Sequence, residues 1–263
     1  MLRWARRSSL GWARREPIRP GRRALAYPSC AGIHAVRLGA VQVVLIIVGA
    51  VLAGLAIRAG WVAAKKRREA LGALAGSLGW SFDASRDDRH DDQYAHFEIF
   101  RIGHSRVAYN TLSGEMEVNG ESWPAKAGDF QYQVTTSNGK TTTTATHRFS
   151  YLIIHLPFAG LPDLLIRREG IFDKLAGVFG FDDIDFESEE FSRRFFVKSP
   201  DKRFAYAVIH PRMMEFLLAA RPPAVDIERG RCCISDGSSL WKPEEYRANM
   251  DMLRKFLELW LLL

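Results

Sequence analysis

The residue types best suited to chemistry gather in one run, DASRDDRHDDQYAH, at residues 83–96. Carboxylate oxygens and neutral imidazole nitrogens can together ligate a divalent cation. A metal site here would use His90, His96, Asp91 and Asp92, and would suit a metal-dependent hydrolase. The run lacks the Asp-x-Asp-x-Asp-Gly order of a calcium-binding loop, and interleaved arginines neutralise it. A solvated loop that caps a short helix near Asp91 explains the same residues without a metal.

Other groups with chemical potential are scattered. SNGKTT contains Gly-Lys-Thr, but Val134 stands where a phosphate-binding loop needs its first glycine. His147 and His155 have no acidic or cysteine partners nearby, so a surface and a core histidine are expected. Cys232 and Cys233 are adjacent, and on a strand one thiol should be buried and the other exposed. No nucleophile elbow, zinc-protease motif or dinucleotide-binding glycine fingerprint occurs in the sequence.

These observations favour a non-catalytic module that binds a protein or a lipid and needs no cofactor. A membrane-tethered, metal-dependent hydrolase that uses residues 83–96 is the alternative.

A segment of twenty residues, 38–57, is apolar apart from Gln42 and is long enough to cross a bilayer, at about 30 Å. It exceeds the apolar region of a cleavable signal peptide, which has roughly 7–15 residues. The segment predicts one retained transmembrane helix, and a buried helix of a soluble core is the alternative. Gly49 and Ala53 lie four apart, which would permit weak homo-association. The residues expected at the membrane interface are Arg58, Trp61, Lys65, Lys66, Arg67 and Arg68.

The formal charge of +7 is concentrated near the N-terminus. Residues 1–37 hold nine Arg and one Glu, whereas residues 59–263 hold 27 basic and 29 acidic side chains. The folded part therefore offers no bulk electrostatic case for binding nucleic acid. Residues 1–37 predict a disordered Arg-rich tail, with a targeting presequence or a later translation start as alternatives. Positive charge flanks both ends of the span, but the absence of a disulfide framework favours a cytosolic domain.

Beyond the span, the chain predicts an α+β fold with a mainly antiparallel sheet and helices packed on one side. A basic juxtamembrane helix is expected over 58–79 and a soluble domain over 80–263, with a break into two lobes near 157–163 as an alternative. FEIF, VAYN and EMEV have the pattern of short strands. Apolar alternation on both sides of Asn138-Gly139 predicts a long hairpin with a two-residue turn.

The second half mixes short strands and helices. PDLLIRRE is typical of a strand, GIFDKLAGVFG of a short helix, and AVDIERGRCCIS of a hairpin. Pro200-Asp201 predicts a turn between two apolar arms, and Pro211 opens a helix. A final helix is expected from about Pro243, with an apolar stripe. The stripe comprises Tyr246, Met250, Leu253, Phe256 and Leu257.

The stretch from Asp183 to Leu218 carries an acidic-aromatic lead, FFV, a Ser-Pro-Asp turn and Met213-Met214. In these features it resembles a bacterial family of membrane-anchored domains of unknown function. The match covers about 35 residues of mostly turn and core types. The resemblance implies one or two N-terminal spans and a cytosolic α+β domain, and brings no catalytic residues. The expectation is a single-pass protein of the bacterial inner membrane.

Overall fold

The protein is described here by a computed structural model that covers residues 39–169 and 184–261. The chain divides into two compact units, Met1–Ala53 and Gly54–Leu263. Helix α1, Ala40–Leu78, begins in the first unit and ends in the second. It is the one helix of the described residues that is long and apolar enough to cross a membrane, with a mean hydropathy of 2.4 over an 18-residue window in which no side chain is buried. This exposed apolar helix agrees with the predicted span.

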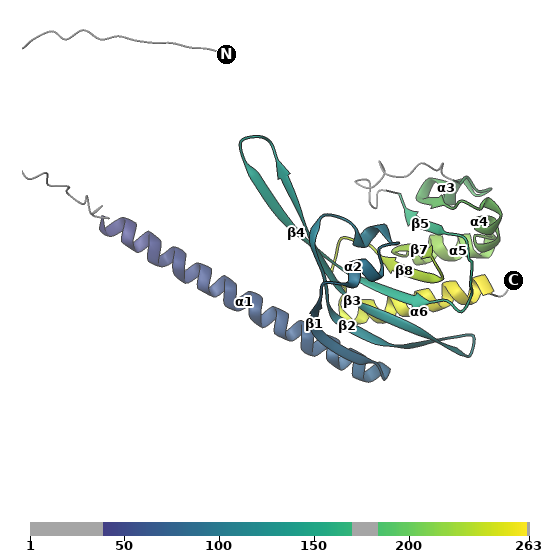
Figure 1. Cartoon of the computed structure of the whole chain (residues 1–263), viewed down its shortest axis with the longest axis horizontal. Helices are drawn as coiled ribbons and strands as arrows, with labels where there is room; N and C mark the ends of the chain where they lie inside the picture. Colours follow the sequence, from purple (N-terminus) through teal and green to yellow (C-terminus); the bar gives the residue numbers. More distant parts are fainter. Residues whose placement is uncertain (1–38, 170–183, 262–263) are drawn as a thin grey trace, which may run out of the picture. The chain divides into compact units, whose positions relative to one another are not determined.

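Eight strands form one antiparallel sheet in the described part of the second unit (Figure 1). Their order across the sheet is β1-β2-β3-β4-β8-β7-β5-β6. The four strands of the first half form a meander, and β8 then pairs with β4 to join the second half to it. The strands are β1 Ser81–Asp87, β2 His104–Val118, β3 Glu121–Ser137, β4 Thr142–His155, β5 Leu164–Arg168, β6 Phe195–Lys198, β7 Ala224–Glu228 and β8 Arg231–Ser235.

The helices from α2 to α5 lie in the connections between strands, and α6 follows the last strand. Helix α6 is the longest of them, and its predicted stripe is buried along its whole length. The mixture of an antiparallel sheet with helices confirms the predicted α+β fold. The helical elements are α2 His90–Gln93, the 3₁₀ helix η1 Glu98–Phe100, α3 Glu189–Arg194, α4 Lys202–Val208, α5 Pro211–Ala220 and α6 Pro243–Leu261.

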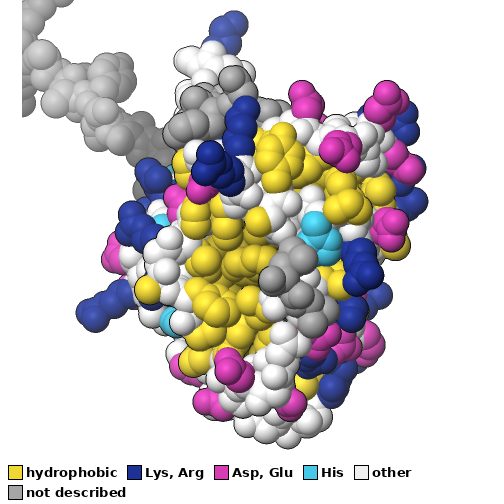
Figure 2. All heavy atoms as spheres, turned by 90° about the vertical axis from the view of Figure 1, so that its right-hand side faces the viewer, with side chains coloured by type: hydrophobic (Ala, Val, Ile, Leu, Met, Phe, Trp, Pro, Cys, Tyr) yellow, Lys and Arg dark blue, Asp and Glu magenta, His cyan; other side chains and the backbone are white. Residues whose placement is uncertain are grey.

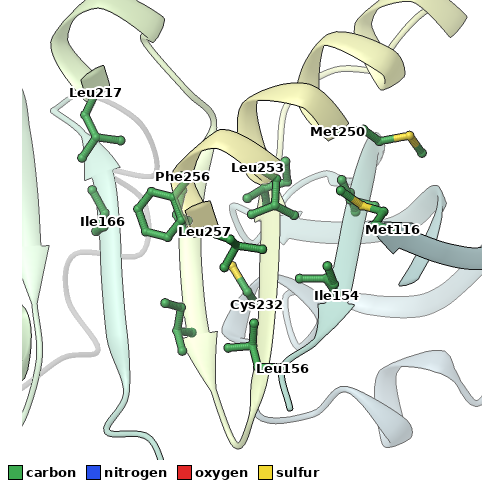
Figure 3. Close-up of a cluster of buried hydrophobic side chains, with 14 of the residues drawn as sticks. Met116, Ile154, Leu156, Ile166, Leu217, Cys232, Met250, Leu253, Phe256 and Leu257 are labelled. Atoms are coloured by element: carbon green, nitrogen blue, oxygen red, sulfur yellow. The ribbon is translucent and has the colours of Figure 1, made fainter. Parts of the chain in front are cut away.

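Hydrophobic side chains form two separate clusters. The larger joins the C-terminal part of α1, α5 and α6 to the sheet, and Figure 3 shows Leu253, Phe256 and Leu257 of α6 beside Cys232 of β8. The smaller is mainly aromatic and joins the segment after β1 to the strands β2, β3, β4 and β8. Because neighbouring residues on a strand face opposite sides, both sides of β8 are covered.

This double cover corrects the prediction for the cysteines. Cys232 belongs to the larger cluster and Cys233 to the aromatic one, and they are 0% and 2% exposed. Their side chains do point in opposite directions, as a strand requires. The prediction that one thiol is exposed was wrong because β8 is an interior strand rather than a half-exposed one.

Two strand predictions were also wrong. FEIF contains η1 instead of a strand, and its Phe97 and Phe100 are both buried in the aromatic cluster. VAYN and EMEV are parts of one long strand, β2. The predicted long hairpin is confirmed as β3 and β4. Its turn has four residues, 138–141, instead of the predicted two. Asn138 Oδ1 stabilises this longer turn by accepting hydrogen bonds from the backbone of Lys140 and Thr141. Of the Asn-Gly pair, only Gly139 has a positive φ, at 82°.

The remaining elements match their predictions closely. PDLLIRRE contains β5, Pro211 is the first residue of α5, and β7 and β8 form a hairpin. The turn at Pro200-Asp201 leads into a helix, because the Asp201 carboxylate caps α4 by accepting from the backbone of Arg203 and Phe204. The predicted tail at 1–37 and the helix GIFDKLAGVFG lie outside the described residues.

Candidate functional site at the end of the basic helix

The residues predicted for the membrane interface differ in burial. Trp61 is 62% exposed, and Lys65 Nζ lies 6.0 Å from the centroid of its ring. Arg67 is half-buried and turns into the domain. The exposed residues of the set are Arg58, Trp61, Lys65, Lys66 and Arg68. Their place at a membrane surface stays a prediction, whereas Arg67 has a different role within the fold.

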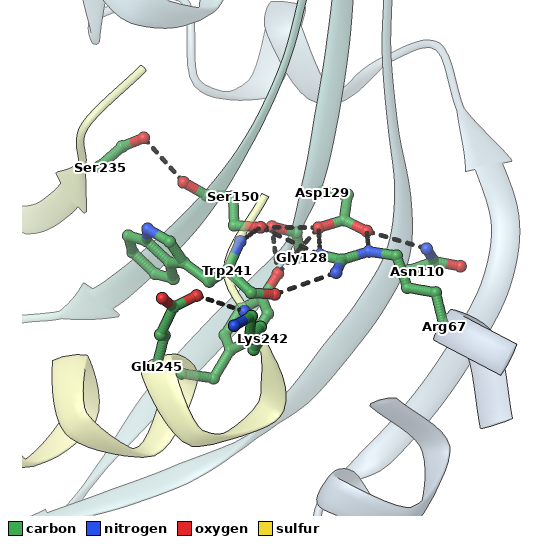
Figure 4. A network of polar contacts seen from close by, with 10 residues as sticks. Arg67, Asn110, Gly128, Asp129, Ser150, Ser235, Trp241, Lys242 and Glu245 are labelled. Carbon is green, nitrogen blue, oxygen red and sulfur yellow. Dashed lines mark hydrogen bonds and ion pairs between the residues drawn. The ribbon is translucent and has the colours of Figure 1, made fainter. Parts of the chain in front are cut away.

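Arg67 forms a bidentate ion pair with Asp129 of β3 (Figure 4). Its Nε donates to Oδ2 at 2.7 Å and its Nη2 to Oδ1 at 2.6 Å. The Asp129 side chain is 0% exposed and that of Arg67 is 21% exposed. Arg67 Nη1 also donates to the carbonyl of Trp241 at 3.0 Å. One side chain of α1 thus contacts both the sheet and the segment before α6.

Neutral donors complete the surroundings of Asp129. Asn110 Nδ2 donates to Oδ2 at 2.9 Å, and Ser150 Oγ donates to Oδ1 at 2.8 Å. The Tyr246 hydroxyl shares its proton between the Gly128 carbonyl at 2.8 Å and Oδ1 at 3.0 Å. Burial, followed by the charge of Asp129, raises the pKa of Tyr246 well above its usual value. That hydroxyl therefore stays protonated. We call Arg67, Asn110, Asp129, Ser150, Trp241 and Tyr246 the Arg67 network.

Local sequence explains how the network forms. Arg67, Leu71 and Leu74 lie at positions i, i+4 and i+7, so they share one face of α1. Leu71 and Leu74 are buried in the larger cluster, which turns Arg67 toward the sheet. On β2, Asn110 lies in a β-bulge and has a φ of 52°, a conformation that asparagine tolerates better than most residues.

The Arg67 network is suited to holding α1 against the sheet, not to reacting. Asn110, Asp129, Ser150 and Tyr246 are each 4% exposed or less. The carboxylate already accepts from a guanidinium and three neutral donors. A nucleophile or a general base must reach its substrate, which these groups cannot do in this arrangement.

The residues of the predicted metal site occupy different surroundings. His90 is 0% exposed, and its ring lies 4.6 to 4.7 Å from those of Tyr94, Phe100 and Tyr151. Burial, followed by the charge of Lys126, lowers its pKa to about 3. Asp91 instead accepts from Arg106 Nε at 2.6 Å.

His96 packs on the ring of Phe97, and Asp92 is exposed. No group of three or more His, Cys, Asp or Glu side chains in the described residues is arranged to hold a metal ion. The short helix expected near Asp91-Asp92 is present as α2. Of the other histidines, His147 stacks on Tyr132 and His155 is half-buried.

An aromatic patch lies at the C-terminal end of α6. Phe158 is 36% exposed, and its ring centroid lies 6.2 Å from that of Trp260. Phe204 of α4 packs on the same Trp260 at 5.8 Å. Figure 2 shows hydrophobic side chains gathered around a hollow on the face of the molecule at this end. Exposed apolar groups of this kind often mark interaction surfaces.

No protein-family model and no curated protein matches the sequence. Among solved structures, the chain is similar to the crystal structure of the mycobacterial trehalose monomycolate transport factor A, TtfA. The two chains are 11% identical, and the match has a TM-score of 0.49. It covers 73% of this chain and 93% of the other.

Sequence reasoning missed the Arg67 network. It assigned Arg67 to the membrane interface together with its neighbours in the KKRR run. A signal was present, since Arg67 continues the apolar face formed by Leu71, Leu74 and Leu78 at helical spacing. Asp129 carries no comparable signal, because its partner lies 62 residues earlier in the chain.

Proposed function

We propose that the chain is a single-pass membrane protein whose α+β domain is a non-catalytic binding module held beside the bilayer. One observation carries this proposal, namely that α1 changes its surroundings along its length. Its first part is apolar and exposed, as a lipid-facing helix requires. Its last part is buried in the core of the second unit and joined to β3 through Arg67.

Within the second unit, Arg67 lies ten residues after Ile57, the last apolar residue of the predicted span. A helix rises about 1.5 Å per residue, so the two are about 15 Å apart along the axis. One head-group layer is about 5–8 Å thick, so Arg67 would lie on the aqueous side of that layer. Of the exposed basic residues between Ile57 and Leu71, Arg58 would lie among the head groups, and Lys65, Lys66 and Arg68 just beyond them. The attachment therefore keeps the domain close to the membrane surface.

Binding is favoured over catalysis because the buried polar groups of the Arg67 network are engaged with one another and the partly exposed patch of Phe158, Phe204 and Trp260 is apolar. A protein or a lipid with an apolar surface would suit that patch. For localisation, we propose the bacterial inner membrane with the domain in the cytosol, which is compatible with two buried cysteines that form no disulfide.

Alkaline carbonate extraction of membranes that carry the full chain tests the anchoring. The chain should stay with the lipid pellet, whereas a variant with Leu45→Arg and Leu52→Arg in the span should move to the supernatant. Release of the unaltered chain would refute the proposal. Protease treatment of sealed, oriented vesicles then reports which side the domain occupies.

Metal analysis of the purified full chain separates the module from the hydrolase. The module predicts no stoichiometric divalent ion. An ion bound at one equivalent and lost in the variant with His90→Ala and His96→Ala would favour the hydrolase instead.

A further inference from the structure

Three basic side chains occupy neighbouring strands on the aromatic face of the sheet. Lys126 of β3 pairs with Ile153 of β4, and His155 of β4 pairs with Arg231 of β8. Ile153 and His155 are two residues apart on one strand and so face the same side. Ile153 belongs to the aromatic cluster, which places Lys126, His155 and Arg231 on that side as well. Directly paired residues on adjacent strands have Cβ atoms about 5 Å apart, so His155 lies beside Arg231, and Lys126 is a diagonal neighbour of His155.

Two of these cations lie over the ring of Tyr94. Lys126 Nζ lies 5.4 Å from its centroid, and Arg231 Cζ lies 5.7 Å from it. Tyr94 follows α2 and is 1% exposed. His96, two residues further along, adds an imidazole whose ring centroid lies 6.1 Å from that of Tyr94. Aromatic faces attract cations, but they do not neutralise them.

Acidic partners balance this group only in part. Lys126 Nζ lies 3.6 Å from Asp87 Oδ2. Arg231 has no ion pair among the described residues, although Glu228 lies opposite it on β7. Among the described residues, Arg231 Nε and His96 Nε2 are also buried and have no hydrogen-bond partner. Buried donors without an acceptor are rare in proteins and cost about 1–3 kcal/mol each, so each calls for an explanation.

Burial and the neighbouring cations both lower the pKa values of the two histidines on this face. Burial, followed by the charges of Arg231 and Arg229, lowers the pKa of His96 to about 4. Burial, followed by Arg231 and Lys126, also lowers the pKa of His155. An anion bound beside Arg231 and His96 would offset the positive charge and supply the missing acceptor.

We propose that Arg231, with Lys126 and His96 beside it, binds a phosphate group. Phosphate suits this site because a guanidinium binds its oxygens through paired hydrogen bonds and an ammonium adds a point charge. The ligand is either free phosphate or the phosphorylated head group of a lipid, which share this chemistry. The site lies on the aromatic face, away from the Arg67 network, and does not depend on the proposed membrane anchoring.

The test uses the full chain in an uncharged detergent at fixed ionic strength, so that screening is constant. Calorimetric titrations use inorganic phosphate, soluble dihexanoyl phosphatidic acid and, as the uncharged comparison, dihexanoyl glycerol. Binding of both phosphate-bearing probes indicates a site for phosphate itself. Binding of phosphatidic acid alone indicates a lipid head group. Either result supports the proposal, and binding of neither overturns it.

Variants place the binding at this site. Arg231→Gln should weaken it by at least about tenfold, because a charge-assisted contact is lost, and Arg231→Lys should weaken it less. Arg203→Gln, which changes an exposed arginine of α4 without a side-chain ion pair in the described chain, should leave affinity unchanged. Equal affinity for Arg231→Gln and Arg203→Gln would overturn the proposal.

A second readout distinguishes a site from a folding defect. On addition of phosphate, the imidazole NMR signals of His96 and His155 should titrate at higher pH in the unaltered chain. Arg231→Gln should lose this response while its unfolding temperature stays within a few degrees of that of Arg203→Gln. A response that is unchanged in Arg231→Gln would contradict the assignment.

Discussion

Arg67→Met should lower the free energy of unfolding of the domain more than a methionine substitution of either neighbouring lysine. Methionine keeps much of the aliphatic stem but removes the guanidinium that faces Asp129. The carboxylate is 0% exposed, so its charge would then be buried without a cation. Removing one partner of a buried ion pair typically costs about 3–5 kcal/mol.

The contacts around Asp129 place the expected effect toward the lower end. Three neutral donors, from Asn110, Ser150 and Tyr246, remain to stabilise the carboxylate after the substitution. Arg67 is also 21% exposed, so water can partly replace it. We therefore expect a loss of about 3 kcal/mol, or a fall of roughly 6–12 °C in unfolding temperature for a domain of this size.

Urea unfolding of the full chain in an uncharged detergent measures this loss, with tryptophan fluorescence and circular dichroism as two probes that should coincide. Lys66→Met is the matched control, because Lys66 belongs to the same basic run and is exposed. It should change the free energy of unfolding by less than about 0.5 kcal/mol.

A double variant tests the charge argument itself. Asp129→Asn removes the uncompensated charge but keeps an oxygen for the neutral donors. Added to Arg67→Met, it should recover about 1–2 kcal/mol relative to the single variant, as expected for directly coupled residues. If Arg67→Met and Lys66→Met were equally stable, the ion pair would not hold α1 to the sheet and the reasoning would fail.

Three further predictions concern the core. The pKa of His90 is about 3 in the folded chain and 6.5 when unfolded, so between these values only the unfolded state takes up this proton as the pH falls. The free energy of unfolding should therefore fall by about 1.4 kcal/mol per pH unit below pH 6.5, and His90→Phe should flatten that slope in urea titrations. A Cβ at Gly114 would lie 2.4 Å from the Trp80 ring, so Gly114→Ala should lower the free energy of unfolding by about 1–3 kcal/mol. Gly76→Ala is the control, because a Cβ there would meet no atom within 4 Å. Burial raises the pKa of both thiols of β8, so they should react slowly in the folded chain. In a Cys30→Ser variant, a thiol reagent should modify the chain only after urea unfolds it, and rapid labelling of the folded chain would argue against burial of β8.

Local patterns predicted much of the fold. Alternation on both sides of Asn138-Gly139 indicated the long hairpin, and the stripe of α6 indicated which of its residues are buried. Both predictions succeed because the periodicity of side chains follows directly from backbone geometry. The strand prediction for FEIF was wrong because four residues are too few to establish a period. Burial of its two phenylalanines is equally compatible with a 3₁₀ helix.

Long-range contacts explain what sequence reasoning missed. The thiols of β8 are both buried because β4 and β7 flank that strand and clusters cover both of its faces. Arg231 and Lys126 reach the ring of Tyr94 only after three strands and the α2 segment have been assembled. No local sequence pattern indicates these long-range contacts.

The position of Arg67 bears on where the folded domain begins. Hydropathy alone ends the anchor near Ile57 and would allow the domain to start after Gly79. Asp129 is fully buried in the sheet, however, and its cation comes from α1. Leu71 and Leu74 of the same helix belong to the larger cluster. A fragment that starts after Gly79 would therefore expose part of the core and leave the carboxylate uncompensated, so the helix after the span is a structural part of the domain. Because the segment after the candidate span also contributes to the core, the domain and this segment of α1 cannot be separated without a loss of stability.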